Sequence, residues 1–395
     1  MPQAASEVRI TGPLAPHAEA LRRHLVGEGY TPLSAVNLLR LAAHLSRWLI
    51  RRRVSLATLS PSLVRRFVHH RRQVGYTGHR STRGMRAIVA FLVSARLIRW
   101  EEPVDDGPYS ETLRRYACYL ARERGLTPAA VRQYRDTAAR FLAGHPDLCK
   151  LVAADITGFV LQQSRRYSVG STKYLVTVLR SLLRYLHVVG EIATDLTGAV
   201  PQIAGWRMVG LPKDAPADDV RRLLQSCPRG TAVGRRDYAI LLLLSRLGLR
   251  ACEAATLTLD DLRWTDGEIA IRGKGSESRL PLTKDIGSAL VAYLRVRRHA
   301  PVRSLFLRVR APQGGLSAES IKAIVLAAGR RAGVALISAH RLRHTTATAM
   351  LRKGASLSEI AQVLRHRSPD TTAIYAKVDT TRLRAIARPW LGGSL

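Results

Sequence analysis

Apolar residues recur at the spacing of one helix face through the N-terminal half of the chain, with arginines at many of the positions between them. Residues 180–186 are typical, because their leucines and tyrosine form an apolar stripe beside a polar one. We therefore predict that this half of the chain is helical throughout.

Two stretches of the helical half resemble each other at an offset of 90 to 96 residues, which predicts a duplicated helical module. Segments at 21–23, 30–32, 67–68, 81–82 and 86–98 match segments at 113–115, 126–128, 159–160, 171–172 and 180–192. Chance likeness between two helical segments rich in Arg and Leu is the alternative. An acidic segment with Pro and Gly, residues 101–108, separates the copies and is expected to be a linker.

A second break rich in Gly and Pro begins at about residue 198, and the pattern beyond it is mixed. Two short strand-like segments at 268–272 and 278–282 flank a turn at 273–276, which predicts a β-hairpin. Helices are predicted at 218–226, 237–247, 285–297, 318–332, 339–352 and 357–364. Ser356 and Glu359 form a capping box at the start of the last one. The expected domains are residues 1–104, 109–198 and 213–395, with a linker at 199–212.

The composition indicates a folded protein with a polyanionic partner. The chain has 395 residues, 46% of them hydrophobic, which is enough for two or three domains with buried cores. Lys and Arg number 63 against 29 Asp and Glu, so the net charge is +34, spread along the chain. A ribosome-associated protein, or a genome whose codons favour Arg, are the alternatives, although codon bias does not explain the scarcity of acidic residues.

Cysteines and apolar runs give further limits. Cys118, Cys149, Cys227 and Cys252 are far apart and form no C-x-x-C pair, which argues against a zinc site and a disulfide scaffold. We expect buried thiols in a reducing cytosol. Arginines bound the longest apolar runs closely, and the N-terminus lacks a signal-peptide pattern, so we expect a cytoplasmic protein without a membrane span.

Candidate chemistry lies near the C-terminus. His340, Arg343 and His344 occupy positions i, i+3 and i+4, so they share one face of a helix, while Leu342 points toward a core. A second block, residues 364–375, contains His366 and ends at Tyr375, which is expected within a helix. That helix is predicted to start at Ser368 and Pro369, since Pro is favoured at the first helical position.

These residue types suit an attack on a phosphodiester, which needs a nucleophile, cations for the phosphate oxygens, a base and an acid. Arg250 follows Gly248 and can direct two donors at phosphate oxygens, and Arg343 can supply a second fork. Two guanidiniums leave little need for a divalent ion, and the sequence shows no carboxylate cluster of metal-ligand type. No cofactor is expected.

Lys274, at the predicted hairpin tip, is notable because lysines are scarce in this chain. Its amine can release a proton when neighbouring cations lower its pKa, whereas a guanidinium stays charged. An ordinary exposed turn lysine is the alternative for this residue taken alone.

Six residues, in this order and at these spacings, resemble the active site of the tyrosine recombinase (phage integrase) family: Arg250, Lys274, His340, Arg343, His366 and Tyr375. The resemblance covers about residues 212–389. Each short motif alone is weak, but the ordered set is specific. The alternative is that the arginines only solvate their helices and that Tyr375 is a half-buried core aromatic.

The resemblance implies a role for each residue. Tyr375 would attack DNA to form a 3′-phosphotyrosyl link, and Arg250 and Arg343 would hold the scissile phosphate. Lys274 would protonate the leaving 5′-oxygen, and His340 would act as the general base. His366 would donate a hydrogen bond to the phosphate. Because the ester keeps the bond energy, strands could rejoin without ATP.

The sequence departs from the family pattern at residues that are not expected to react. Arg365 stands where Gly often precedes the His, and Leu247 stands where Thr commonly precedes Gly-Leu-Arg. Glu253 resembles a recurrent acidic residue and is expected to orient a neighbouring cation. His344 is expected to support the site by packing or hydrogen bonding rather than to react.

The resemblance also implies a fold and partners. The fold is expected to be mainly α with a small β-sheet, in which helical SAM-like DNA-binding domains precede an α+β catalytic domain. Residues 109–198 would be the core-binding domain, and residues 1–104 a degenerate copy that extends the DNA footprint, binds separate DNA sites or contacts a sister recombinase. The partner would be double-stranded DNA, held by a homotetramer on two sites, or with sister recombinases, in the bacterial cytoplasm or nucleoid. The apolar residues of the basic tail would dock on a neighbouring protomer or on their own domain: Leu383, Ile386, Trp390 and Leu391.

The implied function is site-specific recombination of a mobile element, with integration, excision, resolution and transposition left open. A type IB topoisomerase-like relaxase shares the chemistry and is one alternative. A non-catalytic protein that binds recombination sites is another, although the intact set of six residues argues against it.

Overall fold

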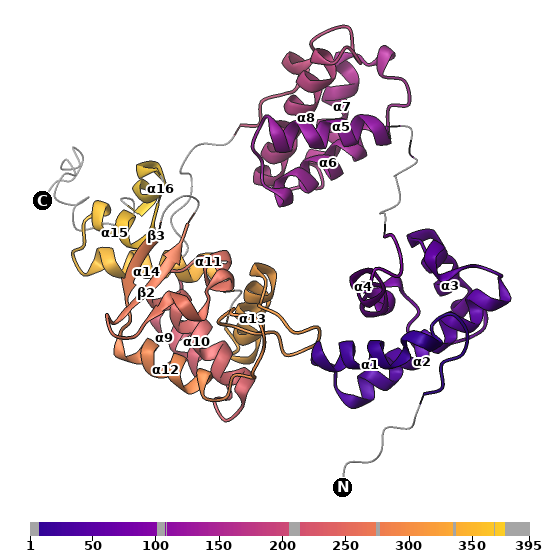
Figure 1. Ribbon diagram of the computed structural model, residues 1–395. Coiled ribbons are helices and arrows are strands. Elements are labelled where there is room, and N and C mark those ends of the chain that lie inside the picture. Colours follow the sequence, from indigo (N-terminus) through magenta and orange to yellow (C-terminus); the bar gives the residue numbers. More distant parts are fainter. Residues whose placement is uncertain are drawn as a thin grey trace, which may run out of the picture. The chain divides into compact units, whose positions relative to one another are not determined.

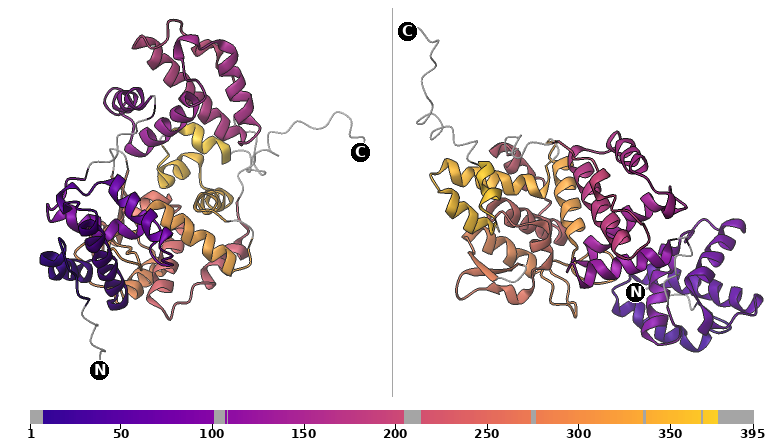
Figure 2. Two further views of the ribbon diagram at one scale, coloured as in Figure 1. Left: turned by 90° about the vertical axis from the view of Figure 1, so that its right-hand side faces the viewer. Right: turned by 90° about the horizontal axis from the view of Figure 1, so that it is seen from above.

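The structure is a computed structural model that describes residues 8–100, 107, 109–204, 214–273, 277–334, 337–366 and 368–375. Figures 1 and 2 show it from three directions. Its helices are α1 (Ala18–Gly27), α2 (Pro32–Arg51), α3 (Pro61–Gln73), α4 (Arg86–Ser94), α5 (Ser110–Arg122), α6 (Pro128–Leu142), α7 (Ala153–Ser164), α8 (Val169–Val188), α9 (Ala217–Gln225), α10 (Ala232–Arg246), α11 (Ala251–Thr256), α12 (Lys284–Leu294), α13 (Ala318–Arg331), α14 (Ala339–Arg352), α15 (Leu357–Leu364) and α16 (Pro369–Ala373). The strands are β1 (Leu262–Arg263), β2 (Glu268–Arg272) and β3 (Glu277–Pro281). The predicted fold, mainly α with a small sheet, is confirmed.

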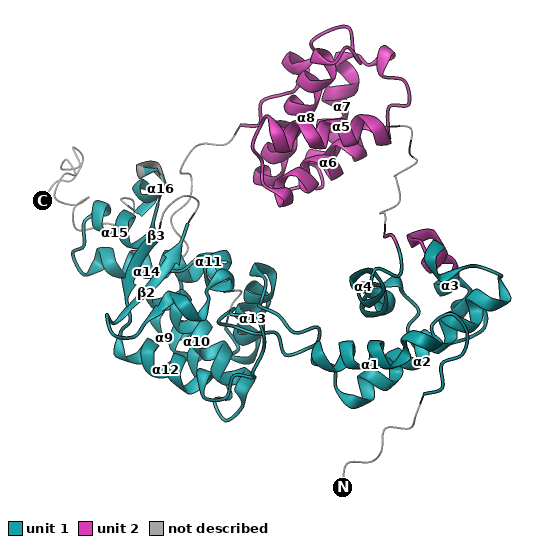
Figure 3. Ribbon diagram, viewed as in Figure 1, with its two compact units in different colours: residues 1–58, 67–98, 210–395 teal, residues 59–66, 99–209 magenta. Residues whose placement is uncertain are grey.

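The chain divides into two compact units (Figure 3). The first comprises Met1–Thr58, Phe67–Ile98 and Gly210–Leu395, and the second comprises Leu59–Arg66 and Arg99–Val209. Helices α5 to α8 belong to the second unit and pack around a core of their own, in which Tyr116 is fully buried. The hydroxyl of Tyr116 donates to Ser181 Oγ at 3.0 Å, so its burial leaves no polar atom without a partner.

Helices α1–α4 and α5–α8 share several local details. Thr31 caps α2 and Thr127 caps α6, each accepting a backbone N–H at 3.3 Å, and each is followed by a proline at the first helical position. After α4 and α8 the chain turns through a left-handed residue, Arg96 with φ 55° and Gly190 with φ 77°. However, α4 has 9 residues and α8 has 20. These details support the duplicated module, which stays a prediction.

Residues 214–375, which we call the C-terminal part, combine α9–α16 with the sheet. The strands are antiparallel in the order β1-β2-β3, and β2 pairs with β3 as the predicted hairpin. Strand β1 was not predicted, because two residues are too short for a periodic signal. Helix α10 starts at Ala232, five residues earlier than predicted, because the Thr231 hydroxyl accepts from Gly234 N at 3.0 Å and caps it. It is buried on several faces and forms the centre of this part.

A small apolar cluster completes the C-terminal part at α14, α15 and α16. It contains Ala347, Leu351, Ile360, Leu364 and Tyr375. The capping box that begins α15 is present, with Glu359 N donating to Ser356 Oγ at 3.2 Å. Helix α16 starts at Pro369 as predicted and ends at Ala373, and Ile374 and Tyr375 continue it as a 3-10 turn, so Tyr375 lies at the end of the helical segment.

Two sequence expectations can be compared with burial. All four thiols are free, but only Cys227 is buried, and the expectation of buried thiols is wrong for Cys118, Cys149 and Cys252. These three occupy exposed faces of their elements, which cysteine spacing alone does not indicate. In the part of the chain that the structure describes, no helix is both long and apolar enough to span a membrane.

Candidate active site

Helix α14 presents two histidines on one face. Ser338 begins the helix, its hydroxyl accepting from Arg341 N at 3.1 Å. The Nε2 atoms of His340 and His344 lie 2.9 Å apart, and their ring centroids lie 4.2 Å apart in an edge-on arrangement. Leu342 points the other way and is fully buried in the main core, as the helical spacing predicted.

Arg343, on the same helix, is 3% exposed and is held by backbone carbonyls. Its NH1 donates to the Gly248 carbonyl at 2.6 Å, and its NH2 donates to the Leu364 carbonyl. Gly248 has a φ of +59°, and a Cβ there would meet Leu364 Cδ2 at 2.5 Å, so the position favours glycine. Burial, and then the charge of Arg250, lowers the pKa of Arg343 to about 10. Carbonyls orient the guanidinium without neutralising it, so its charge remains available to an anion.

Glu253 holds Arg250 at the start of α11. Its Oε2 accepts from the Arg250 backbone N–H at 2.8 Å, and its Oε1 accepts from Arg250 NH1 at 2.7 Å. Burial opposes ionisation of Glu253, but the hydrogen bonds from Arg250 and the charge of Arg365 outweigh it, and the pKa of Glu253 is lowered. The Arg250 side chain is 40% exposed, so it is both anchored and accessible to an anion.

Arg365 completes this network from the end of α15. It adopts the left-handed conformation, φ 55° and ψ 50°, which explains why glycine is usual at this position. Its NH2 donates to Glu253 Oε2 at 2.9 Å, and its carbonyl accepts from Arg250 NH2 at 3.3 Å. The departure from the family pattern therefore adds a second cation to Glu253. Sequence reasoning identified the unusual backbone position and missed this side-chain contact.

We expect Glu253→Ala to destabilise the C-terminal part by about 3–5 kcal/mol, because the substitution leaves a buried guanidinium without its carboxylate. The Arg365 side chain is only 10% exposed. Thermal unfolding of the full chain measures the change. Adding Arg365→Gly to Glu253→Ala should recover a large part of the loss, since the two residues form one pair. Equal loss in the single and double variants would contradict this account.

Tyr375 is 1% exposed and packs in the small apolar cluster. Its hydroxyl lies 2.7 Å from His344 Nδ1, and His344 in turn contacts His340, as described above. A consistent protonation has Tyr375 donating to His344 Nδ1, and His344 Nε2–H donating to His340. Burial raises the pKa of Tyr375 to about 12, although Arg343 opposes the rise. His344, expected only to support the site, is the residue that contacts the hydroxyl.

His366 lies beside the tyrosine ring. Its Nδ1 is 2.7 Å from Thr372 Oγ1, and its ring is nearly parallel to that of Tyr375, at 5° and 6.4 Å between centroids. The backbone N–H of His366 donates to the Ala361 carbonyl at 2.9 Å and closes the end of α15. The ring is therefore oriented from both its backbone and its side chain.

All three histidines are biased toward the neutral form. Burial lowers the pKa of His344 and of His366 to about 4 and also lowers that of His340. His340 and Arg343 add to the effect on His344, and Arg343 and Arg250 add to the effect on His340 and His366. Because each folded-state pKa is below the ordinary value of about 6.5, protonation favours the unfolded state. Stability is thus present above pH 6.5 and is lost as the pH falls toward 4.

We therefore expect the unbound protein to unfold at a lower temperature at pH 5 than at pH 7. Calorimetry or circular dichroism at the two pH values measures the difference. Replacing His344 and His366 by Asn removes the two most shifted groups and should reduce the pH dependence in this window. An unchanged dependence in that variant would assign the effect to other groups.

The C-terminal part thus gathers Arg250, His340, Arg343, His366 and Tyr375, the residues predicted from the sequence. Lys274 lies outside the described residues, between strands β2 and β3. Among the described residues, no three His, Cys, Asp or Glu side chains lie close enough together to hold a metal ion.

The C-terminal part, mainly helical with a small sheet, thus brings two fixed guanidiniums together with a buried tyrosine. Residues 214–382 match the model of the phage integrase family. The protein y4rA of Sinorhizobium fredii, which is named as an integrase/recombinase, is 38% identical to this chain over 392 residues. The match covers 96% of this chain and 95% of y4rA. Tyrosine recombinase XerD of Listeria monocytogenes is 31% identical over 283 residues, covering 68% of this chain and 94% of XerD. The chain belongs to the phage integrase family of tyrosine recombinases.

Solved structures agree at the level of the fold. XerH recombinase bound to palindromic difH substrate, in a post-cleavage complex, has a TM-score of 0.58 and 18% identity over 83% of this chain and 94% of XerH. A lambda integrase tetramer bound to a Holliday junction has a TM-score of 0.53 and 16% identity, covering 77% of this chain and 86% of that one. At these identities the likeness concerns the fold alone.

Proposed function

We propose that this protein is a site-specific DNA recombinase that cuts and rejoins strands through a 3′-phosphotyrosyl intermediate formed on Tyr375. The contact between the Tyr375 hydroxyl and His344 Nδ1, at 2.7 Å, carries the proposal. It gives the one tyrosine of the ordered motif a proton acceptor, in a cluster that also contains Arg343. The names of the relatives, and the DNA in the solved complexes of XerH and lambda integrase, support DNA as the substrate.

Arg250 and Arg343 would hold the non-bridging oxygens of the scissile phosphate. Arg343 is fixed by two carbonyls and Arg250 by Glu253, so neither has to be reoriented as charge develops. Two preorganised guanidiniums supply the charge that a divalent ion supplies in other phosphotransfer sites. On this basis we propose that the reaction needs no metal. The ester preserves the energy of the broken bond, so rejoining needs no ATP.

DNA binding would also prepare the proton transfer. In the unbound chain the pKa of Tyr375, about 12, is far above that of His344, about 4, so the hydroxyl keeps its proton. A phosphate next to these rings raises the histidine pKa, because a negative charge favours the imidazolium. The proton would then move from Tyr375 to His344 and on toward His340, with His366 donating to the phosphate. The nucleophile would thus be activated where a phosphodiester is bound.

The test is covalent trapping on a duplex with a nick close to the cleavage position, from which the short product diffuses away. We expect an SDS-resistant adduct with the DNA 3′ end attached, a free 5′-hydroxyl on the other product, and Tyr375 as the modified residue on peptide mapping. An adduct mapped to another residue would refute the assignment. Relaxation of arbitrary supercoiled DNA, without products from paired sites, would favour a topoisomerase-like activity. Binding of DNA without cleavage would favour a non-catalytic DNA-binding protein.

Lys274 is proposed as the acid that protonates the leaving 5′-oxygen. Lys274→Ala should slow cleavage strongly on a normal duplex, and far less on one with a 5′-bridging phosphorothiolate, because a thiolate leaves without a proton. Single-turnover rates on the two substrates measure the difference. Lys284→Ala, which changes an exposed lysine at the start of α12, is the matched control. Equal slowing on both substrates would remove Lys274 from this role.

We further propose a homotetramer on two DNA sites, or assembly with sister recombinases, that exchanges strands through a Holliday junction. Residues 109–198 would be the core-binding domain and residues 213–395 the catalytic domain with its tail. A crosslinked complex on two-site DNA, sized by light scattering, tests the stoichiometry. Discrete assemblies of one protomer on each DNA, with no larger species during recombination, would contradict it.

A further inference from the structure

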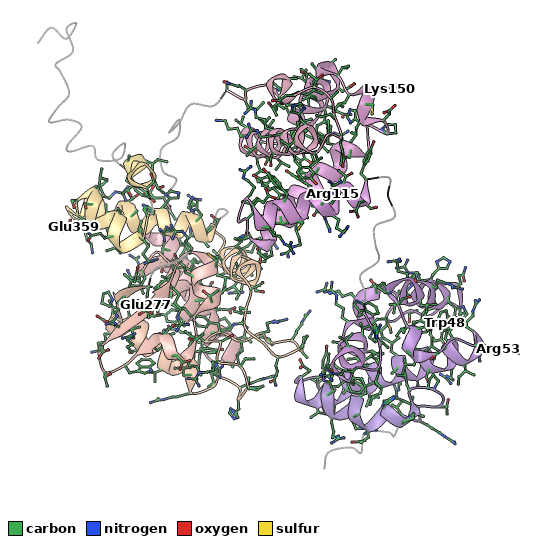
Figure 4. The ribbon with its side chains drawn as sticks, turned by 45° about the horizontal axis from the view of Figure 1, so that its top comes forward. Trp48, Arg53, Arg115, Lys150, Glu277 and Glu359 are labelled. Carbon is green, nitrogen blue, oxygen red and sulfur yellow. The ribbon has the colours of Figure 1, made fainter. Side chains whose placement is uncertain are left out.

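A pocket of about 220 Å³ lies among helices α1–α4, which we call the first helical group, between α2, α3 and the loop after α3. Every titratable residue that lines it is a cation, an imidazole or a phenol: His44, Arg47, Arg51, His70, Arg71 and Tyr76. The lining contains no Asp or Glu. Figure 4 labels Trp48, which also lines the pocket, and Arg53 near the end of the same helix.

Arg71 is the buried cation of this pocket, at 5% exposure. Its NH2 donates to the Gly78 carbonyl at 3.1 Å, but its Nε and NH1 are buried without a hydrogen-bond partner. Trp48 Nε1 is likewise buried without a partner. The pocket thus collects three unpaired donors and no carboxylate, which is the complement of a ligand that only accepts hydrogen bonds.

Without a ligand, this arrangement lowers the stability of the folded chain. A buried guanidinium without a carboxylate keeps its desolvation penalty, and unpaired buried donors add to it. The Tyr76 ring, whose centroid lies 4.2 Å from the Arg71 guanidinium, offsets part of the penalty by a cation–π contact. Tyr76 is 37% exposed and its hydroxyl lies 3.3 Å from His44 Nδ1, so it covers the Arg71 guanidinium from the surface. An anion would accept hydrogen bonds from the donors of Arg71 and Trp48 that have no partner in the unbound chain.

The surrounding charge identifies the anion as part of a polymer. Residues 29–100 contain fourteen arginines and no Asp or Glu, whereas residues 109–200 contain seven acidic residues. Burial, followed by the charges of Arg47 and Arg71, lowers the pKa of His44, and burial and Arg71 lower that of His79. A positive potential of this extent exceeds what one small anion neutralises and suits a nucleic-acid backbone.

We propose that this pocket binds a phosphate group of the DNA backbone. Arg71 supplies the buried charge, Arg47 and Arg51 supply the rim, and Tyr76 rotates off the guanidinium as the phosphate enters. The first helical group is then a DNA-binding module that fixes the position of the protein by phosphate contacts. The inference rests on the proposed function for the identity of the polymer, but it does not involve Tyr375 or its neighbours.

The test is the salt dependence of duplex binding by the full chain, measured by fluorescence anisotropy. Wild type is compared with Arg71→Met, with the double rim variant Arg47→Gln/Arg51→Gln, and with Arg40→Gln, an exposed α2 arginine outside the pocket. We expect weaker binding in both pocket variants, and a slope of log K against log salt shallower by about 1 for the phosphate lost. Slopes equal to that of Arg40→Gln in both pocket variants would overturn the proposal.

The rim variant keeps Arg71 and changes only exposed residues, so it remains informative if Arg71→Met unfolds. Inorganic phosphate, added at an ionic strength matched with chloride, tests the other source of the same chemistry. Saturable phosphate binding that Arg71→Met abolishes, together with an unchanged DNA slope, would assign the pocket to free phosphate and overturn the DNA assignment. Failure of the proposed function is distinct, since the wild type would then form no adduct on Tyr375, whereas the salt slopes of the variants concern binding and not cleavage.

Discussion

Tyr375→Phe should abolish covalent attachment to DNA, with no adduct above background on the nicked duplex. The substitution removes the hydroxyl that contacts His344 and keeps the ring that packs on Ile360 and Leu364. A histidine that attacked in its place would form a bond from nitrogen to phosphorus and not the phosphotyrosyl ester. The measurement is SDS gel electrophoresis of labelled DNA after single-turnover incubation.

The matched control is Tyr293→Phe. Tyr293 is also buried in the C-terminal part, at 4% exposure, and its hydroxyl accepts from Leu307 N at 3.2 Å, away from the arginine cluster. This variant loses a buried hydrogen bond of similar size and should retain adduct formation. Binding of Tyr375→Phe to intact duplex should match that of the wild type. An adduct that persisted in Tyr375→Phe would place the nucleophile elsewhere.

Elements with a strong local signal were predictable from the sequence. Helices α14 and α15 have the predicted bounds, because period-3.6 patterns coincide there with caps at Ser338 and Ser356. The β2–β3 hairpin was predicted because two short strand-like segments flank a turn rich in glycine. In each case the deciding interactions lie within a few residues along the chain, and a pattern in the sequence records them.

The contacts that orient the site join residues far apart in the sequence. Arg365 reaches Glu253 across 112 positions, and Arg343 reaches the Gly248 carbonyl across 95. The order of the motif residues along the chain predicted which residues belong to the site. No periodicity in the sequence indicates which carboxylate forms an ion pair with which arginine. The His344 contact with Tyr375 was missed for the same reason, since it depends on how α16 returns to α14. The presence of Arg365 at a position where glycine is usual was the one feature of the sequence that pointed to these contacts.

Arg343→Lys should slow cleavage on the order of 10²–10³-fold, the loss expected when a preorganised donor is removed from a developing charge. A lysine keeps the charge, but its single ammonium cannot reach the Gly248 and Leu364 carbonyls and also present a flat pair of donors to a phosphate. A carbonyl left without its donor costs about 1–3 kcal/mol in addition. The unfolding temperature and the cleavage rate should therefore both fall.

Arg352→Lys separates these effects. Arg352 lies on the same helix, and its side chain is 68% exposed in an ion pair with Asp214, so the conservative change should alter neither quantity measurably. For Arg343→Lys, the rate is measured at saturating DNA and at a temperature where circular dichroism shows a folded chain. The chemical step should then remain slow although binding is saturated, because the lost interactions belong to the transition state. A rate that recovered fully under these conditions would reduce Arg343 to a structural residue and leave Arg250 as the cation that stabilises the reacting phosphate.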